Sequence, residues 1–105
     1  MPRSVIVTGS PEQQRPDERV AYQVTIDASY ASPATPVCAL WDITDTTAVV
    51  DVTATKLSGS PSIVGQVFTS PLVIALVAAH TYRLEFQFVS GGNTFEPYLK
   101  IKGVA

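Results

Sequence analysis

The sequence predicts an all-β protein: a single immunoglobulin-like sandwich of about seven or eight short strands, with a jelly roll as the alternative topology. Three observations predict this class. Apolar and polar side chains alternate along several short segments, turn-forming residues separate these segments at intervals of about 8 to 12 residues, and apolar residues rarely follow helical spacing. The chain has 105 residues, the usual size of one domain, so we expect residues 1–105 to form a single unit.

The N-terminal part predicts two strands separated by a polar segment. Residues 19–27 alternate strictly, as in a half-buried strand, and their apolar members are Val20, Tyr22, Val24 and Ile26. A shorter strand is expected at residues 5–8. Between them, residues 9–18 (GSPEQQRPDE) predict a solvated loop or arm, whose removal should leave the thermal transition nearly unchanged. We expect this arm to contact a neighbouring subunit through Pro11, Gln13, Gln14 and Arg15.

Four short strands are predicted in the middle of the chain, at residues 37–43, 48–53, 63–68 and 72–76. Trp41 stands in the middle of the first of them, where immunoglobulin-like sandwiches often place a core tryptophan. The last of them begins an apolar run that extends to residue 79. We interpret this run as a central strand covered on both faces, and the alternative is an oligomer interface formed by Leu72, Val73 and Ile74.

The C-terminal part predicts a long hairpin. Inward-facing residues alternate from Tyr82 to Phe88, and the sequence Ser-Gly-Gly-Asn at residues 90–93 supplies a turn that tolerates positive φ. The pattern then resumes through residues 95–101. Pro97 interrupts the last strand, so that strand should lie at an edge or carry a bulge, and we expect an interface there that includes Tyr98.

Leu76 and Tyr82 have the spacing of a tyrosine corner. In this motif the tyrosine hydroxyl binds a backbone group at the turn between the two sheets. We therefore expect Leu76, Tyr82 and Trp41 to have structural roles. The cystine that joins the sheets of antibody domains is absent, because Cys38 is the only cysteine.

The composition of the chain argues against several functional classes. The net charge is -2 and only 15% of the residues are charged, which argues against a nucleic-acid-binding protein that works through a basic field. The longest apolar run is half the roughly 18 residues of a membrane-spanning helix, and no export signal is recognisable. We expect a reducing, cytoplasmic site of synthesis. The mean hydropathy of +0.21 is high for a small domain, which predicts surface that contacts another protein.

Catalytic and metal-binding patterns are weak. His80 has no serine and carboxylate at triad spacing, so a turn or surface role is expected. Asp42, Asp45 and Asp51 surround one predicted hairpin, but their spacing matches no calcium loop, and we interpret them as turn-capping residues. Cys38 is expected to be a buried, inert thiol. We therefore predict that the protein is not an enzyme and uses no cofactor or metal ion.

One binding alternative stays open. Tyr30, Trp41 and Tyr98 would form a platform for stacking sugars if they shared a face, as in carbohydrate-binding or adhesion sandwiches. Gly91 and Gly92 precede a strand rather than a helix, so they predict a hairpin turn and not a phosphate-binding loop.

Three short stretches together resemble small structural proteins of tailed bacteriophages, of the fiber-tail adaptor, head-tail accessory or capsid cement type. They are PDE at residues 16–18 leading into YQV at 22–24, AHTYRL at 79–84, and GGNTFE at 91–96 before LKI at 99–101. The resemblance implies a non-enzymatic virion component that is made in the host cytoplasm. It also implies binding to phage capsid or tail proteins, assembly as a homo-oligomer, and no nucleic-acid or membrane partner.

Overall fold

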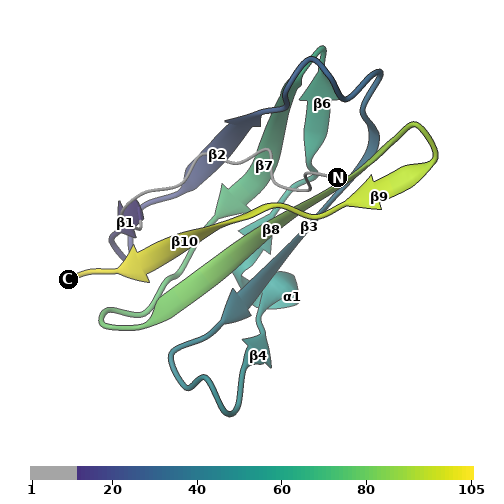
Figure 1. Cartoon of the computed structure of the whole chain (residues 1–105). Helices are drawn as coiled ribbons and strands as arrows, with labels where there is room; N and C mark the ends of the chain where they lie inside the picture. The colour runs from purple at the N-terminus through teal and green to yellow at the C-terminus, as the bar shows by residue number, and fades with distance from the viewer. Residues whose placement is uncertain (1–11) are drawn as a thin grey trace.

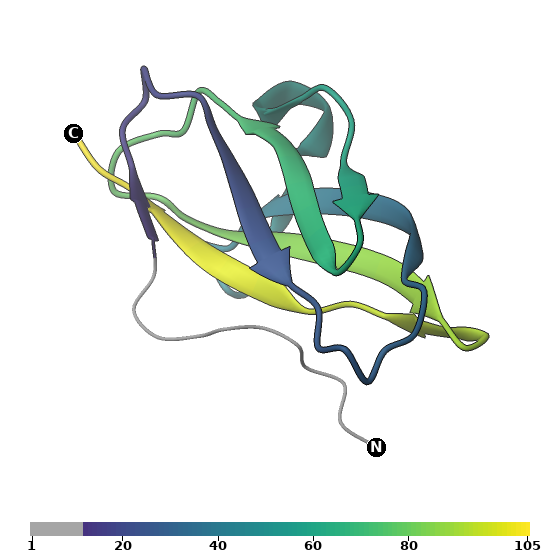
Figure 2. The same ribbon diagram turned by 90° about the horizontal axis from the view of Figure 1, so that it is seen from above.

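The computed structural model describes residues 12–105 as two β-sheets packed face to face (Figure 1). Figure 2, turned by 90°, shows the sheets as two layers. Strands account for nearly all of the regular structure in this range, and the helix α1 (Thr53–Lys56) has only four residues. The predicted all-β sandwich is confirmed. The predicted strand at residues 5–8 and the contact residue Pro11 lie outside the described residues.

The strand order is that of an immunoglobulin-like sandwich. The six-stranded sheet has the order β1-β10-β8-β3-β4, with β9 also paired to β8, and the four-stranded sheet has the order β2-β7-β5, with β6 also paired to β7. The strands of the first sheet are β1 (Glu12–Gln14), β3 (Ala34–Asp42), β4 (Val50–Asp51), β8 (Thr81–Ser90), β9 (Asn93–Phe95) and β10 (Tyr98–Gly103). Those of the second are β2 (Val20–Thr25), β5 (Leu57–Ser58), β6 (Ser62–Val64) and β7 (Val67–Val73). This order, and not that of a jelly roll, corresponds to the two sheets of immunoglobulin domains.

The core lies between the sheets and is centred on β8. Every second residue of β8 is buried, as the alternation in the sequence predicts. Phe86 from β8 meets Phe68 from β7 edge to face, with ring centroids 5.1 Å apart, so one aromatic pair joins the two layers. Gly91 and Gly92 then turn the chain into β9, both at positive φ, as expected for the predicted hairpin.

Three predicted strands are divided differently in the structure. The strand predicted at residues 72–76 is not a separate one, because Leu72 and Val73 are the last residues of β7 and residues 74–76 lie outside any strand. Residues 63–68 form not one strand but the hairpin of β6 and β7, because Gly65 adopts a φ of +60° and reverses the chain between them. Within residues 48–53, only Val50 and Asp51 are in a strand, and they form β4. The Thr53 amide then donates to the Asp51 carboxylate, and the chain enters α1.

Pro71 lies inside a central strand, which sequence rules disfavour because proline lacks an N–H donor. The structure accommodates it in a bulge: Ser70 and Pro71 together lie opposite Tyr22, between the pairs Ala21–Leu72 and Gln23–Thr69. The Ser70 hydroxyl accepts a hydrogen bond from the Tyr22 amide at 3.0 Å and donates to the Pro71 carbonyl at 2.7 Å. The Ser70 side chain therefore supplies an acceptor for the Tyr22 amide where the bulge interrupts the ladder.

The polar segment before β2 is not a solvated arm throughout. Residues 12–14 form β1, which pairs in parallel with β10, and Gln14 is fully buried. Residues 15–18 make a tight turn in which the Arg15 amide donates to the Glu18 carboxylate at 2.7 Å. The expectation that residues 9–18 can be removed without effect on stability is wrong for Gln14, because its amide side chain belongs to the interior.

Tyr82 closes the turn between the two sheets. Its side chain is fully buried, and its hydroxyl accepts a hydrogen bond from the Val77 amide at 2.9 Å. Leu76 is also buried, at 1% exposure. This is the contact that the spacing of Leu76 and Tyr82 predicts.

Replacing Tyr82 with phenylalanine should lower the free energy of unfolding by about 1 to 3 kcal/mol, because the part-buried hydrogen bond from the Val77 amide is lost while the ring is kept. Chemical denaturation monitored by circular dichroism measures the difference. Tyr98→Phe is the matched control, since that ring is 49% exposed, and it should change stability by no more than about 0.5 kcal/mol. Equal effects of the two substitutions would contradict the corner.

Candidate functional site

The most distinctive surface of the protein is the outward side of the six-stranded sheet, here called the outer sheet face. Strand pairing places outward side chains of β3, β8 and β10 in rows across it. We define the outer sheet face by nine residues: Val37, Ala39, Trp41, Arg83, Glu85, Gln87, Tyr98, Lys100 and Lys102.

Trp41 belongs to this face and not to the core. Leu40, its neighbour in β3, is the buried residue at 0% exposure, so period-two alternation turns Trp41 outward. The expected core role of Trp41 is therefore wrong. The inward position that a core tryptophan would take is filled by Leu40 and, more peripherally, by Cys38.

Glu85 contacts both Trp41 and Arg83 at the centre of the outer sheet face. Its carboxylate accepts a hydrogen bond from Trp41 Nε1 at 3.0 Å through one oxygen, and the other oxygen lies 3.0 Å from Arg83 Nε. The Glu85 side chain is only 17% exposed, whereas that of Arg83 is 34% exposed. The carboxylate thus fixes an indole and a guanidinium side by side on a sheet surface.

Apolar side chains surround this centre. Val37 is 47% exposed and Tyr98 is 49% exposed, and Trp41 and Ala39 are half-buried. Tryptophan, tyrosine and arginine are the residue types that dominate binding energy in protein interfaces. The outer sheet face therefore has the chemical character of a protein contact surface.

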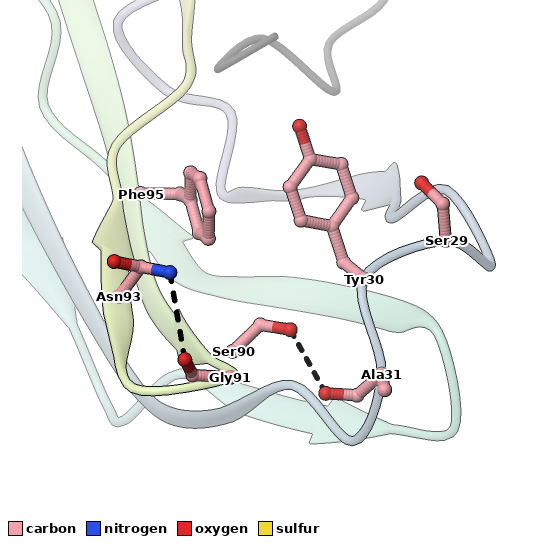
Figure 3. Close-up of a pocket in the computed structure, with 7 residues that line it drawn as sticks. All are labelled: Ser29, Tyr30, Ala31, Ser90, Gly91, Asn93 and Phe95. Carbon is pink, nitrogen blue, oxygen red and sulfur yellow. Dashed lines mark hydrogen bonds between the residues drawn. The ribbon is translucent and has the colours of Figure 1, made fainter. Parts of the chain in front are cut away.

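A pocket of about 340 Å³ opens at one end of the sandwich, between the loop after β2 and the turn from β8 to β9 (Figure 3). Phe95 and Tyr30 form its apolar wall, with ring centroids 4.8 Å apart. Ser90 ties the two loops together, because its hydroxyl donates to the Ala31 carbonyl at 2.9 Å. The other lining residues are Ser29, Gly91 and Asn93. The pocket can enclose a small apolar group, but these residues include no carboxylate, histidine or thiol.

The three aromatic residues considered for sugar stacking are not gathered in one place. Tyr30 is 8% exposed and packs in the core cluster at the loop end. Trp41 and Tyr98 lie on the outer sheet face, on β3 and β10, which are separated by β8. A platform of all three residues is therefore wrong because of Tyr30, although Trp41 and Tyr98 do share one face.

His80 pairs with Asp42. Its Nδ1 atom lies 2.7 Å from Asp42 Oδ2, so the turn before β8 is joined to the end of β3. Partial burial raises the pKa of Asp42, but hydrogen bonds from the Thr44 hydroxyl, from His80 and from the Thr44 amide outweigh it and leave that pKa below its usual value. The pair works as a structural link, which agrees with the turn role expected for His80.

The aspartates around β4 cap turns. Asp42 and Asp45 each accept hydrogen bonds from both the amide and the hydroxyl of the threonine two residues later, and Asp51 accepts one from the Thr53 amide. These bonds use the carboxylate oxygens locally, as predicted. Within residues 12–105, no group of three or more histidine, cysteine, aspartate or glutamate side chains is placed to hold a metal ion.

Cys38 and Tyr22 are partly buried groups that pack against the core. Burial raises the pKa of the Cys38 thiol to about 12. Burial, with the nearby charges of Glu12 and Glu18, raises the pKa of the Tyr22 hydroxyl to about 12. The high pKa of Cys38 means that this thiol is not a nucleophile at neutral pH.

We expect alkali to destabilise the protein through these two groups. From about pH 9 to pH 12 the unfolded chain loses both protons while the native protein keeps them, so the free energy of unfolding falls as pH rises. Denaturant unfolding measured at several pH values gives the slope. Cys38→Ala should make the lower part of this decline less steep, and an unchanged slope in that variant would contradict the assignment to Cys38.

The residues predicted for an interface are dispersed. Val73 is fully buried between the sheets, because it ends β7 on the inward side, and Leu72 and Ile74 are half-buried. The central-strand interpretation holds only for residues 71–73, which end β7, and it is wrong for residues 74–79, which form no strand and include exposed positions such as Val77. Gln14 is buried, whereas Gln13, Arg15 and Tyr98 are exposed. Only Tyr98 belongs to the outer sheet face.

Sequence reasoning missed Arg83 and Glu85, and it placed Trp41 on the wrong side. A signal was present: Cys38 and Leu40 alternate with Ala39 and Trp41, and on β8 Arg83 and Glu85 alternate with inward apolar residues. Assigning one facing to each strand would have put the indole and the charged pair on the same outer surface.

Comparison with known proteins gives no match, either to a family model or to a curated protein sequence. Among the residues that the structure describes, no helix has the length and apolarity needed to cross a membrane.

Proposed function

We propose that the protein is a non-enzymatic structural component of a tailed-phage virion, which bridges or decorates capsid or tail subunits. The observation that supports this proposal is the outer sheet face. It joins a half-buried Trp41, an exposed Tyr98 and an exposed Val37 to a fixed ion pair. A rigid surface of this composition suits contact with another protein.

The immunoglobulin-like scaffold supports the same proposal. Its interior is filled by buried apolar side chains from both sheets, so binding is expected on exposed faces and loop ends and not inside the domain. The residue stretches that resemble phage structural proteins connect this contact role to a virion. Capsid cement and head-tail or tail adaptor are the two forms of the proposal.

Quantitative mass spectrometry of purified virions from the source of this sequence tests the proposal. A cement protein should be present in hundreds of copies per particle, and an adaptor in a ring of about six or twelve. Absence of the chain from the particles would overturn the proposal. Electron microscopy of the same particles with a labelled antibody then assigns the copies to the shell or to the tail.

A further inference from the structure

Two basic residues, a tryptophan and an aspartate form one row across the six-stranded sheet. Strand pairing sets Lys100 of β10 opposite Arg83 of β8, Arg83 opposite Trp41 of β3, and Trp41 opposite Asp51 of β4. These strands lie side by side in Figure 1. Directly paired residues project to the same side of a sheet, so all four side chains belong to the outer surface.

The charge along this row changes from positive at one end to negative at the other. The row begins with the exposed ammonium group of Lys100 and ends with the exposed carboxylate of Asp51, and a guanidinium and an indole lie between them. A partner of a single charge would meet repulsion at one end of this row. A surface that presents the same row in the reverse direction would complement it at every position.

We propose that a second copy of this chain packs on the outer sheet face, related by a two-fold axis that runs parallel to the strands between β8 and β3. Such an axis exchanges β10 with β4 and β8 with β3. Lys100 then faces Asp51 of the second copy, and Arg83 faces its Trp41. Each contact occurs twice, as two-fold symmetry requires. The first is an ion pair and the second places a cation over an aromatic ring.

Four strands meet across the proposed axis, because it exchanges β10 with β4 and β8 with β3 and leaves β1 without a counterpart. The ten residues of β8 and the nine of β3 extend about 30 Å, and four strands spaced about 4.8 Å apart extend about 14 Å between the outermost two. The footprint is on the order of 400 Å² per copy, which is the size of a weak, transient contact and is below the roughly 800 Å² per partner of a standard interface. Sheets packed face to face keep their strands within about 30° of each other, so the paired rows stay near one another.

This inference rests on the proposed function only in treating the outer sheet face as a protein contact surface. Sedimentation velocity on the purified full chain tests it. The unchanged chain should sediment as a dimer. Lys100→Asp and Asp51→Lys should each raise the dimer dissociation constant at least tenfold, because each puts like charges at both copies of the contact.

The decisive measurement is an equal mixture of these two variants. In the mixed dimer, both contacts again join opposite charges, so the mixture should recover dimer that neither variant forms alone. Arg19→Asp is the control, since it makes the same charge change at an exposed residue outside the face and should leave the dimer unchanged. Thermal unfolding of Asp51→Lys checks the loss of its bond to Thr53, and Lys100→Asp disturbs no such bond.

A monomeric wild-type chain, or a dimer that neither variant weakens, would overturn the inference. So would a mixture with no more dimer than its components. A monomeric chain that is nevertheless present in virions would leave the proposed function standing. If the Lys100→Asp variant were then missing from the virions, the outer sheet face would bind a capsid or tail protein and not a second copy.

Discussion

Replacing Gln14 with leucine should lower the free energy of unfolding by about 3 to 5 kcal/mol. The Gln14 side chain is fully buried and makes three hydrogen bonds. Nε2 donates to the Val73 carbonyl at 2.7 Å and to the Glu18 carbonyl at 3.1 Å, and Oε1 accepts from the Tyr22 hydroxyl at 2.8 Å. Leucine has a similar volume but leaves these three groups without their partner. Since small domains are stable by only about 5 to 15 kcal/mol, the effect is a large part of the total.

Gln13→Leu is the matched control for this prediction. Gln13 precedes Gln14 in β1 but is exposed, so its substitution should change stability by no more than about 0.5 kcal/mol. The double variant with Tyr22→Phe supplies a second check. In the Tyr22→Phe background, Gln14→Leu should lower the free energy of unfolding by less, because the hydroxyl that would have lost its hydrogen-bond partner is absent. Denaturant unfolding measures five proteins: the unchanged chain, the three single variants Gln13→Leu, Gln14→Leu and Tyr22→Phe, and the double variant. Equal effects at residues 13 and 14 would contradict the buried role of Gln14.

Gln14 shows why part of this fold could not be predicted from sequence. A glutamine between prolines and charged residues has the composition of a loop, and its burial depends on partners 59 positions away at Val73 and on the pairing of β1 with β10. Pro71 is similar, since its place in a central strand depends on the Ser70 hydroxyl and a bulge. Such positions are decided by distant partners that local patterns do not contain.

Local signals succeeded where the physical cause was local. The alternation in β8 follows from one face being covered, and the two glycines at residues 91 and 92 supply the positive φ that their turn requires. The three aspartates that precede threonines by two residues cap turns for the same reason, because the bond forms within three residues. The outer sheet face could be predicted only in part. Its residues alternate visibly, but their arrangement in rows depends on strand register, which the sequence does not display.

Among the glycines of residues 12–105, Gly103 is the one at which alanine should be most destabilising, with an expected loss of at least about 3 kcal/mol. A Cβ atom at Gly103 would lie 2.1 Å from the Val77 carbonyl oxygen, far inside normal contact. The clash is with backbone that cannot easily move. The Gly103 amide donates to the His80 carbonyl at 2.8 Å, and its carbonyl accepts from the Ala79 amide at 2.9 Å.

Gly92→Ala separates this steric effect from backbone preference. Gly92 has a φ of +79°, with nothing within 4 Å of an added Cβ, so alanine there should cost only about 1 kcal/mol through its left-handed conformation. The Gly103 substitution should also be coupled to the tyrosine corner, because the carbonyl it displaces belongs to Val77, whose amide binds the Tyr82 hydroxyl. In the Tyr82→Phe background, Gly103→Ala should therefore lose less stability than it does alone. Full additivity in thermal and denaturant unfolding would mean that the end of β10 and the corner respond independently, and would contradict this packing.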